Sequence, residues 1–217
     1  VTIGNSVSTI GNYAFSDCIG LTEIIIPNSV TSIKNNAFSG CTGFTNITIP
    51  NSVTTLGDEE NKNIFENCTN LTTVTIESQN VASMSDLKSY FGEQVTTYIL
   101  EDNVTSIGSS AFKDCTSLTN ITIPESVTSI GTSAFYGCTG LTDITIPNSV
   151  TSIRASTFEG CTGLTDVFLP TSILEISGDA FKGCTSLCHI EIPSSVMTLG
   201  HSYPVWGTYM PFTNCTN

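Results

Sequence analysis

Residues 110–130 read SAFKDCTSLTNITIPESVTSI and residues 133–153 read SAFYGCTGLTDITIPNSVTSI, so nearly the same segment recurs after 23 residues. A repeat of fixed period outranks local signals in deciding a fold. With the cysteine of each copy as marker, the copies from Cys18 to Cys215 are 23, 27, 47, 23, 23, 23 and 31 residues apart. The interval of 47 is two periods plus one residue, which indicates a degenerate turn over residues 77–100. We therefore expect one domain, residues 1–217, of about nine stacked turns.

Each unit contains three short segments. In L-T-x-I-x-I-P, Leu141, Ile144 and Ile146 are predicted to point inward, and Asp143 and Thr145 outward, as in a half-buried strand that the proline ends. The next segment, N-S-V-T-S-I, predicts a second short extended piece, and the following A-F-x-x-C fits a single helical turn. One unit is too small to bury its own apolar face, so it must stack on its copies at about 4.8 Å.

The repeated pattern L-x-x-I-x-I-P-x-x-V-x-x-I-G-x-x-A-F-x-x-C covers nearly the whole chain. It resembles the BspA-like leucine-rich repeats of surface proteins from bacteria and some protists. The resemblance implies a leucine-rich-repeat solenoid with a parallel β-sheet on the concave face, and short second strands and helical turns on the other side. It also implies a cell-surface or extracellular location and a role in adhesion or host-protein binding, but a fold alone does not define a function.

Composition narrows the classes of partner. Charged residues make up 12% of the chain and the net charge is -13, which repels phosphate backbones and anionic membrane surfaces. We therefore expect no nucleic acid as a partner and no membrane insertion, since no apolar run approaches the roughly 20 residues that span a bilayer. No leader-like segment opens the chain, which begins and ends within repeat units. We expect a piece of a longer protein whose exposed ends are able to self-associate.

The nine cysteines raise the question of metal sites or disulfides. A metal is disfavoured because Cys184 and Cys188 are the only close pair, with His189 alone beside them and no second pair to complete four ligands. Stacked cysteines would lie about 5 Å apart at Cα, but their Cβ atoms would point in parallel into the core. We expect free, buried thiols that fill space, and no metal or cofactor.

A phenylalanine three residues before each marker cysteine forms a second column. We interpret it as a structural spine of the core, not as a ladder for stacking ligands. Its predicted members are Phe15, Phe38, Phe65, Phe112, Phe135, Phe158, Phe181 and Phe212.

Function is expected on the outward positions of the strands, because the repeated interior is scaffold. These positions hold Glu23 and Ile25, Asn46 and Thr48, Thr73 and Thr75, Thr97 and Ile99, Asn120 and Thr122, Asp143 and Thr145, Asp166 and Phe168, His189 and Glu191. The C-terminal half of this surface combines acidic groups with an unpaired aromatic ring, which suits a basic or apolar partner. The candidate residues there are Asp143, Asp166, Phe168, His189 and Glu191. A solvated sheet face without a partner stays open as the alternative.

Two departures from the repeat lie in the N-terminal half. The insertion GDEENKN, residues 57–63, carries three acidic residues but lacks the D-x-D-x-D-G spacing of a calcium loop, so we expect a solvated acidic loop. In the degenerate turn, MSDLKSYFG predicts a short helix with Ser85 as N-cap and Gly92 at its end. Leu87, Tyr90 and Phe91 are expected to form its apolar face over the core.

The third departure is HSYPVWGTYMPF, residues 201–212, with an insertion over 201–211. It contains Tyr203, Trp206 and Tyr209 between two prolines. Rigid aromatic side chains on a loop are typical of a binding hot spot. They are also what the apolar end of a solenoid needs as a cover. Both interpretations stay open, and the three aromatics join the candidate binding residues.

No catalytic constellation is recognisable. The chain has two histidines, His189 and His201, and lacks H-E-x-x-H, G-x-S-x-G and a Gly-rich phosphate loop followed by Lys. Asp143 and Asp166 form a carboxylate pair across turns, but an open face offers no pocket to desolvate either. We expect a non-enzymatic domain that binds a protein or glycan.

Two other functions are weighed. A purely structural stalk would hold another domain away from a surface. An ice-binding solenoid is suggested by the column of Thr48, Thr75, Thr122 and Thr145, but Ile, Phe and Glu residues interrupt it.

Six N-x-T triplets begin at Asn46, Asn67, Asn70, Asn103, Asn120 and Asn214. In a secretory eukaryotic host, glycans on Asn46 and Asn120 would occupy the proposed binding face and argue against its use.

Overall fold

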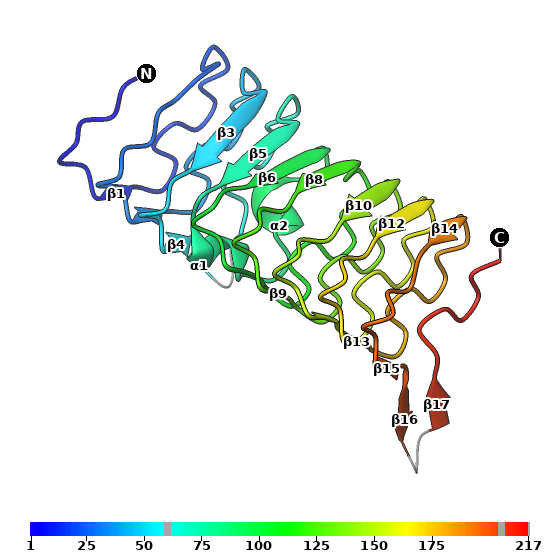
Figure 1. Ribbon diagram of the computed structural model, residues 1–217. Coiled ribbons are helices and arrows are strands. Elements are labelled where there is room, and N and C mark those ends of the chain that lie inside the picture. Colours follow the sequence, from blue (N-terminus) through cyan, green and yellow to red (C-terminus); the bar gives the residue numbers. More distant parts are fainter. Residues whose placement is uncertain (59–61, 204–206, 217) are drawn as a thin grey trace.

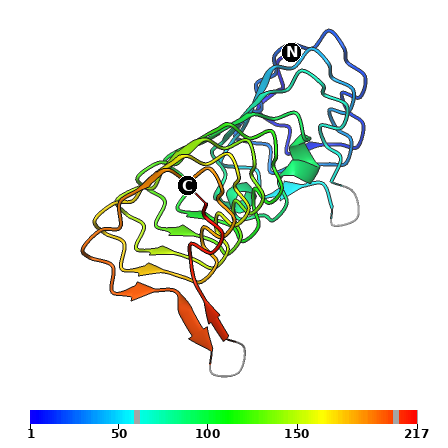
Figure 2. The same cartoon turned by 90° about the vertical axis from the view of Figure 1, so that its right-hand side faces the viewer.

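The computed structural model describes residues 1–58, 62–203 and 207–216. The chain winds into a parallel β-solenoid of about eight turns (Figure 1). Each turn runs along a longer strand, a short strand and a segment of reverse turns. Figure 2 looks obliquely along the stack and shows the successive turns nested behind one another.

The longer strands form one side of the solenoid, which we call the long-strand face. They are β3 (Asn46–Ile49), β5 (Thr73–Ile76), β6 (Thr97–Leu100), β8 (Asn120–Thr122), β10 (Asp143–Thr145), β12 (Asp166–Phe168) and β14 (His189–Ile190). The short strands are β1 (Thr9–Ile10), β2 (Ser32–Ile33), β4 (Thr55–Leu56), β7 (Ser106–Ile107), β9 (Ser129–Ile130), β11 (Ser152–Ile153), β13 (Glu175–Ile176) and β15 (Thr198–Leu199). Residues 23–26, which bridge to Thr2 of the preceding turn through Ile25, occupy the place of a longer strand before β2.

Parallel pairing holds neighbouring turns in a fixed register. Asp143 lies opposite Asp166, which lies opposite His189, so equivalent residues of successive units stack in columns. The longer strands form one sheet of order β3-β5-β6-β8 and a second of order β10-β12-β14. The expected alternation is confirmed: in β10 the side chain of Ile144 is buried, whereas Asp143 and Thr145 are exposed.

The A-F-x-x-C segments differ from the expected single helical turn. The amides of Ala134, Tyr136 and Cys138 donate to carbonyls three residues earlier in the chain. The amides between them, such as that of Phe135, donate instead to the next turn, here to Thr157 O at 2.9 Å. The segment is therefore a run of reverse turns that shares its hydrogen bonds with its neighbour, and stacking satisfies amides that a helix would satisfy internally.

In most runs of turns two positions adopt a left-handed backbone. One of them precedes the cysteine directly, and its φ is 70° at Gly137, 75° at Gly160 and 55° at Asp114. Glycine, Asn and Asp tolerate this conformation best, which explains why other side chains are rare at this point of the unit.

The core is a continuous column of phenylalanine rings. Phe112, Phe135 and Phe158 stack in parallel with centroids 5.3 Å apart, and all three side chains are fully buried. The predicted spine is thus confirmed, but it has two members that the sequence pattern did not supply. Phe91 stacks on Phe65 at 5.4 Å, and Tyr98 makes edge contacts that connect Phe91 to Phe112 across the degenerate turn.

The degenerate turn contains two short helices, α1 (Gln79–Ala82) and α2 (Lys88–Phe91). The expected N-cap at Ser85 is wrong: α2 begins after Leu87 without a side-chain cap, whereas Ser78 caps α1 through its hydroxyl. Gly92 does end α2, with φ of 98°. Gln94 stands where other units have cysteine, and its amide donates to the carbonyls of Cys68 and Phe91.

The expected burial of Leu87, Tyr90 and Phe91 is confirmed, because all three side chains lie in the hydrophobic core. This short helix therefore covers the core in the turn that lacks a cysteine.

All nine cysteines are free, as expected, and six of them are buried. Five of these thiols, all except that of Cys115, donate to a phenylalanine carbonyl of the preceding turn; for example, the Cys161 thiol donates to Phe135 O at 3.0 Å. Burial raises the pKa of Cys41 to about 11 and that of Cys68 to about 12. The expectation of burial is wrong for Cys18 and Cys188, which are exposed.

The C-terminal insertion forms an antiparallel hairpin of β16 (His201–Tyr203) and β17 (Gly207–Tyr209). Its strands extend away from the stack in both views (Figures 1 and 2). The chain then returns to the solenoid, since Phe181 N donates to Pro211 O at 2.8 Å and Phe212 stacks on Phe181 at 5.3 Å. The hairpin strands therefore do not lie over the last turn as a cover.

Candidate functional site

The charges of the chain are segregated around the solenoid. Five of the six basic residues lie between a short strand and the next cysteine position, which is the side formed by the reverse turns, and Lys88 lies in α2 of the degenerate turn. Eight acidic residues lie on the longer strands, at the equivalent positions 23–26, or in the loops directly after them. These are Glu23, Glu77, Glu101, Asp102, Glu125, Asp143, Asp166 and Glu191. All Lys, Arg, Asp and Glu side chains on the long-strand face and in its loops are therefore acidic.

The strand register stacks Asp143, Asp166 and His189 in one column, with Phe168 in the same strand as Asp166 and Glu191 directly after β14; we call these five residues the acidic–aromatic patch. The Phe168 ring is 53% exposed, although most large apolar side chains of the solenoid are buried. The hydroxyls of Thr142 and Thr165 donate to the adjacent carboxylates of Asp143 and Asp166, at 3.0 and 2.7 Å. These bonds orient the two carboxylates on a rigid sheet.

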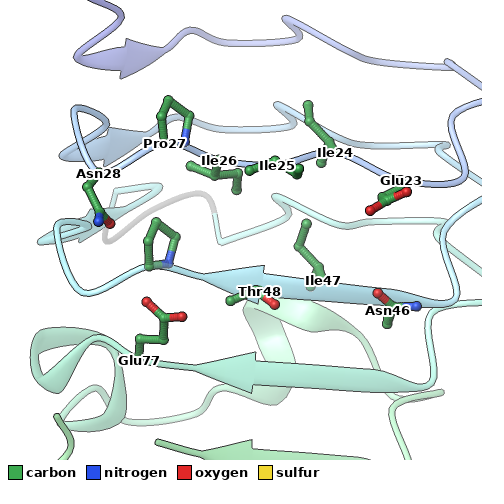
Figure 3. Close-up of a pocket in the computed structure, with 11 residues that line it drawn as sticks. Glu23, Ile24, Ile25, Ile26, Pro27, Asn28, Asn46, Ile47, Thr48 and Glu77 are labelled. Carbon is green, nitrogen blue, oxygen red and sulfur yellow. The ribbon is translucent and has the colours of Figure 1, made fainter. Parts of the chain in front are cut away.

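A groove of about 430 Å³ lies at the other end of the long-strand face (Figure 3). Ile25 and Thr48 line its middle, and the strand-ending prolines Pro27 and Pro50 also belong to its lining. Glu23 and Asn46 lie at one end, and Glu77 lies at the other. Ile25 is 66% exposed, so the groove offers apolar surface between two carboxylates.

The groove coincides with an interruption of the sheet. In most later turns the amide of the Thr that precedes the strand donates one turn back, as from Thr72 to Thr45 O and from Thr165 to Thr142 O, but β8 and β10 are likewise unpaired. Within the described parts of the chain, β3 pairs only with β5, and residues 23–26 pair only through a bridge from Ile25 to Thr2. The edge of β3 that faces residues 23–26 is thus without a strand partner in this structure.

The remaining predicted binding residues lie in the hairpin. Tyr203 is the last residue of β16 and Tyr209 the last of β17, whereas Trp206 lies outside the described residues. Tyr203 and Tyr209 belong to the hairpin and not to the strands that carry the acidic–aromatic patch. The role of all three residues in binding stays a prediction.

The structure locates two further features that bear on chemistry. Asn46 and Asn120 are exposed on the long-strand face, as the triplet positions imply. No group of three or more His, Cys, Asp or Glu side chains is placed to hold a metal ion among the residues that the structure describes. In the same residues, no helix is long and apolar enough to cross a bilayer.

The groove is the part of the site that sequence reasoning missed. One signal was present: Glu77 stands where most units have the strand-ending proline. Glu77 matters for the groove because it lies near residues 23–28 and 46–50 of two other turns. The repeat period alone does not reveal this proximity.

The stacked parallel strands and the buried Leu, Ile and Phe columns define a leucine-rich-repeat solenoid. The BspA type leucine-rich repeat region, in six copies, matches residues 1–90 and 86–203, so the chain belongs to this family. No curated protein matches the chain.

Several solved structures are similar to it. A leucine-rich cell surface protein from Faecalibacterium prausnitzii A2-165 is 32% identical, with a TM-score of 0.53 over 99% of this chain and 57% of that one. A leucine-rich repeat protein from T. pallidum is 25% identical, with a TM-score of 0.54 over 73% of this chain and 72% of that one. The chain thus spans little more than half the length of the Faecalibacterium protein.

Proposed function

We propose that the chain is a non-catalytic binding domain of a cell-surface protein, and that its long-strand face holds a protein or glycan partner. The proposal rests on the long-strand face, whose charged side chains are all acidic and which also exposes apolar side chains. The acidic–aromatic patch brings both kinds of side chain together. A rigid sheet loses little conformational entropy when it binds, which favours affinity from several modest contacts. The cell-surface description of the Faecalibacterium relative supports the location.

The chemistry of this face favours a partner with basic and apolar groups. Charge complementarity speeds association and selects against acidic partners. The Phe168 ring supplies an exposed aromatic anchor beside the oriented carboxylate of Asp166.

Binding of the fluorescently labelled domain to cultured cells and to immobilised matrix proteins tests this proposal. The triple variant Asp143→Asn, Asp166→Asn, Phe168→Ala is expected to bind about tenfold more weakly, because it removes two charges and the aromatic anchor. The control variant Glu66→Gln, Glu93→Gln changes the same number of charges on the reverse-turn side and should bind within about twofold of the unmodified domain.

Equal binding by the triple variant and the unmodified domain would instead support the stalk. A variant that lacks residues 201–210 separates the hairpin from the patch in the same assay. If the deletion alone abolishes binding, the partner is held by the hairpin and the proposal for the long-strand face is wrong.

A further inference from the structure

We propose that the solenoid has a hinge at the β8–β10 joint, the contact between the turn of β8 and β9 and the next turn of β10 and β11. The hinge opens on the two strand sides and is held on the reverse-turn side. It divides the described chain into an N-terminal block, residues 1–58 and 62–139, and a C-terminal block, residues 143–203 and 207–216. The hinge is a property of the fold and does not depend on the proposed binding role.

Strand pairing is interrupted on both strand sides of the stack at this joint. The longer strands form one sheet that ends at β8 and another that begins at β10 (Figure 1), and the short strands are divided between β9 and β11. At each other joint in the described chain, at least one of the two columns of strands is paired. The β8–β10 joint is thus the one place, within the described residues, where neighbouring turns lack strand pairing on both sides.

Two backbone amides outside the strands show the same interruption. Before β12, the amide of Thr165 donates one turn back to Thr142 O at 2.8 Å. Before β13, the amide of Leu174 donates to Thr151 O at the same distance. The amides of Thr142 and Thr151 occupy the equivalent positions at the β8–β10 joint, but neither donates to a backbone carbonyl of the preceding turn. Both residues are exposed, so water can satisfy these amides.

The apolar side chains beside the interruption are incompletely covered. Ile121 in β8 and Ile123 directly after it are half-buried, although both pack against the core. Their equivalents in the next turn, Ile144 and Ile146, are 2% and 3% exposed. The other half-buried side chains that pack on the core lie in the first turn, the last two turns or, in the case of Met84, the degenerate turn. The missing pairing explains this exposure in the middle of the solenoid, because a paired β10 would cover these side chains.

The reverse-turn side of the same joint is intact. The amide of Phe135 donates to Thr157 O at 2.9 Å. The amide of Gly137 donates to Glu159 O at 2.8 Å. The Phe135 ring also stacks on that of Phe158, with centroids 5.3 Å apart. These contacts keep the core closed and act as the pivot, so a bend changes the separation of β8 and β10 most and that of the reverse turns least.

Side-chain contacts also cross the joint in the loop between the two strand columns. The backbone amide of Asn148 donates to the Glu125 carboxylate at 3.0 Å. The Ser149 hydroxyl donates to Val127 O. A serine bond of this kind recurs at joints whose strands are paired, so it does not replace the missing strand pairs. The loop contacts therefore limit the bend without closing the strand sides.

A bend at this joint changes the angle between two parts of the long-strand face. The acidic–aromatic patch lies entirely on the C-terminal block. The N-terminal block carries the neutral outward column Asn46, Thr73, Thr97 and Asn120. A ligand shifts a conformational equilibrium toward the state that it binds better. A partner that contacts both blocks would therefore select one bend of the solenoid, whereas a partner of the patch alone would not.

Hydrogen exchange of the domain, followed by NMR, tests the missing bonds. The amides of Thr142 and Thr151 are compared with those of Thr165 and Leu174, their equivalents at the next joint. We expect protection factors about tenfold or more lower for the first pair, because only the second pair donates to the preceding turn. Equal protection of the two pairs would show that the strands pair across the joint in solution, and the inference would be wrong.

Distances between spin labels test whether the two blocks move. The three cysteines that are not buried are first replaced by serine. The labelled pair Thr75→Cys, Thr145→Cys then spans the β8–β10 joint, and the matched pair Thr48→Cys, Thr122→Cys spans the same number of turns within the N-terminal block. We expect a distance distribution about twofold wider for the pair across the joint. Equal widths would show a rigid joint and overturn the hinge, even if the exposed amides exchange rapidly. The proposed function would stand in that case, since the acidic–aromatic patch lies within one block.

Discussion

Replacing Phe135 by alanine lowers the free energy of unfolding by about 4 kcal/mol, the loss typical of a fully buried phenylalanine. The Phe135 ring is stacked between Phe112 and Phe158 at 5.3 Å on either side, so its removal opens a cavity in the middle of the column. The surrounding turns are tied by backbone hydrogen bonds in fixed register and cannot close in to fill it.

Urea unfolding followed by circular dichroism measures this loss. Phe168→Ala is the matched control, because its ring is 53% exposed on the long-strand face, and we expect a change below about 0.5 kcal/mol. Similar losses for the two variants would contradict the division of aromatic residues into a structural column and an exposed anchor.

Replacing Gly160 by valine lowers the free energy of unfolding by about 2 kcal/mol, because a β-branched residue is strained in a left-handed backbone. Gly160 has φ of 75°, and its amide donates to Lys182 O of the next turn at 2.8 Å. A valine that relaxed toward negative φ would turn this amide away from its acceptor.

Gly160→Asn is the informative control for this variant. Asn67 adopts φ of 60° and Asp114 adopts φ of 55° at the same point of other units, so asparagine should cost only a few tenths of a kcal/mol. Thermal unfolding distinguishes the two variants. If they unfold at the same temperature, the left-handed conformation does not limit stability at this position.

The stacking of the turns could be predicted from the sequence, because it depends on apolar and polar side chains that recur with a fixed period. Ile47 and Ile49 are buried and Thr48 is exposed because alternating apolar residues have only one way to cover a core. The reverse turns were not predicted, because A-F-x-x-C has helical spacing, whereas the inter-turn hydrogen bonds of Phe135 and its neighbours exist only after stacking.

The degenerate turn shows a second limit of sequence analysis. Phe91 lies 26 residues after Phe65 and 21 before Phe112, off the period of 23, and it also completes the apolar face of a short helix, so its place in the spine was concealed. Gln94 replaces cysteine with no similarity in polarity or size. Its role depends on two carbonyls that only the folded chain places within its reach.

The candidate site was predictable where equivalent residues of successive turns stack in columns, because the repeat period already aligns them. The acidic–aromatic patch lies where the outward positions of successive strands place Asp143 and Asp166. The groove was not predictable, since it depends on the missing pairing between residues 23–26 and β3, and no residue type in either segment forbids that pairing.

The central claim is that each turn hides its apolar faces only against its neighbours, with the cysteine column inside. Timed labelling of the native protein with a small thiol reagent at pH 8, read by mass spectrometry, tests it most directly. We predict rapid labelling of Cys18 and Cys188, slower labelling of half-buried Cys215, and labelling of the six buried cysteines only in urea. Burial raises the pKa of Cys68 and Cys115 to about 12, which keeps these thiols protonated at this pH. Rapid labelling of most of the nine cysteines without urea would contradict the stacked interior and the account built on it.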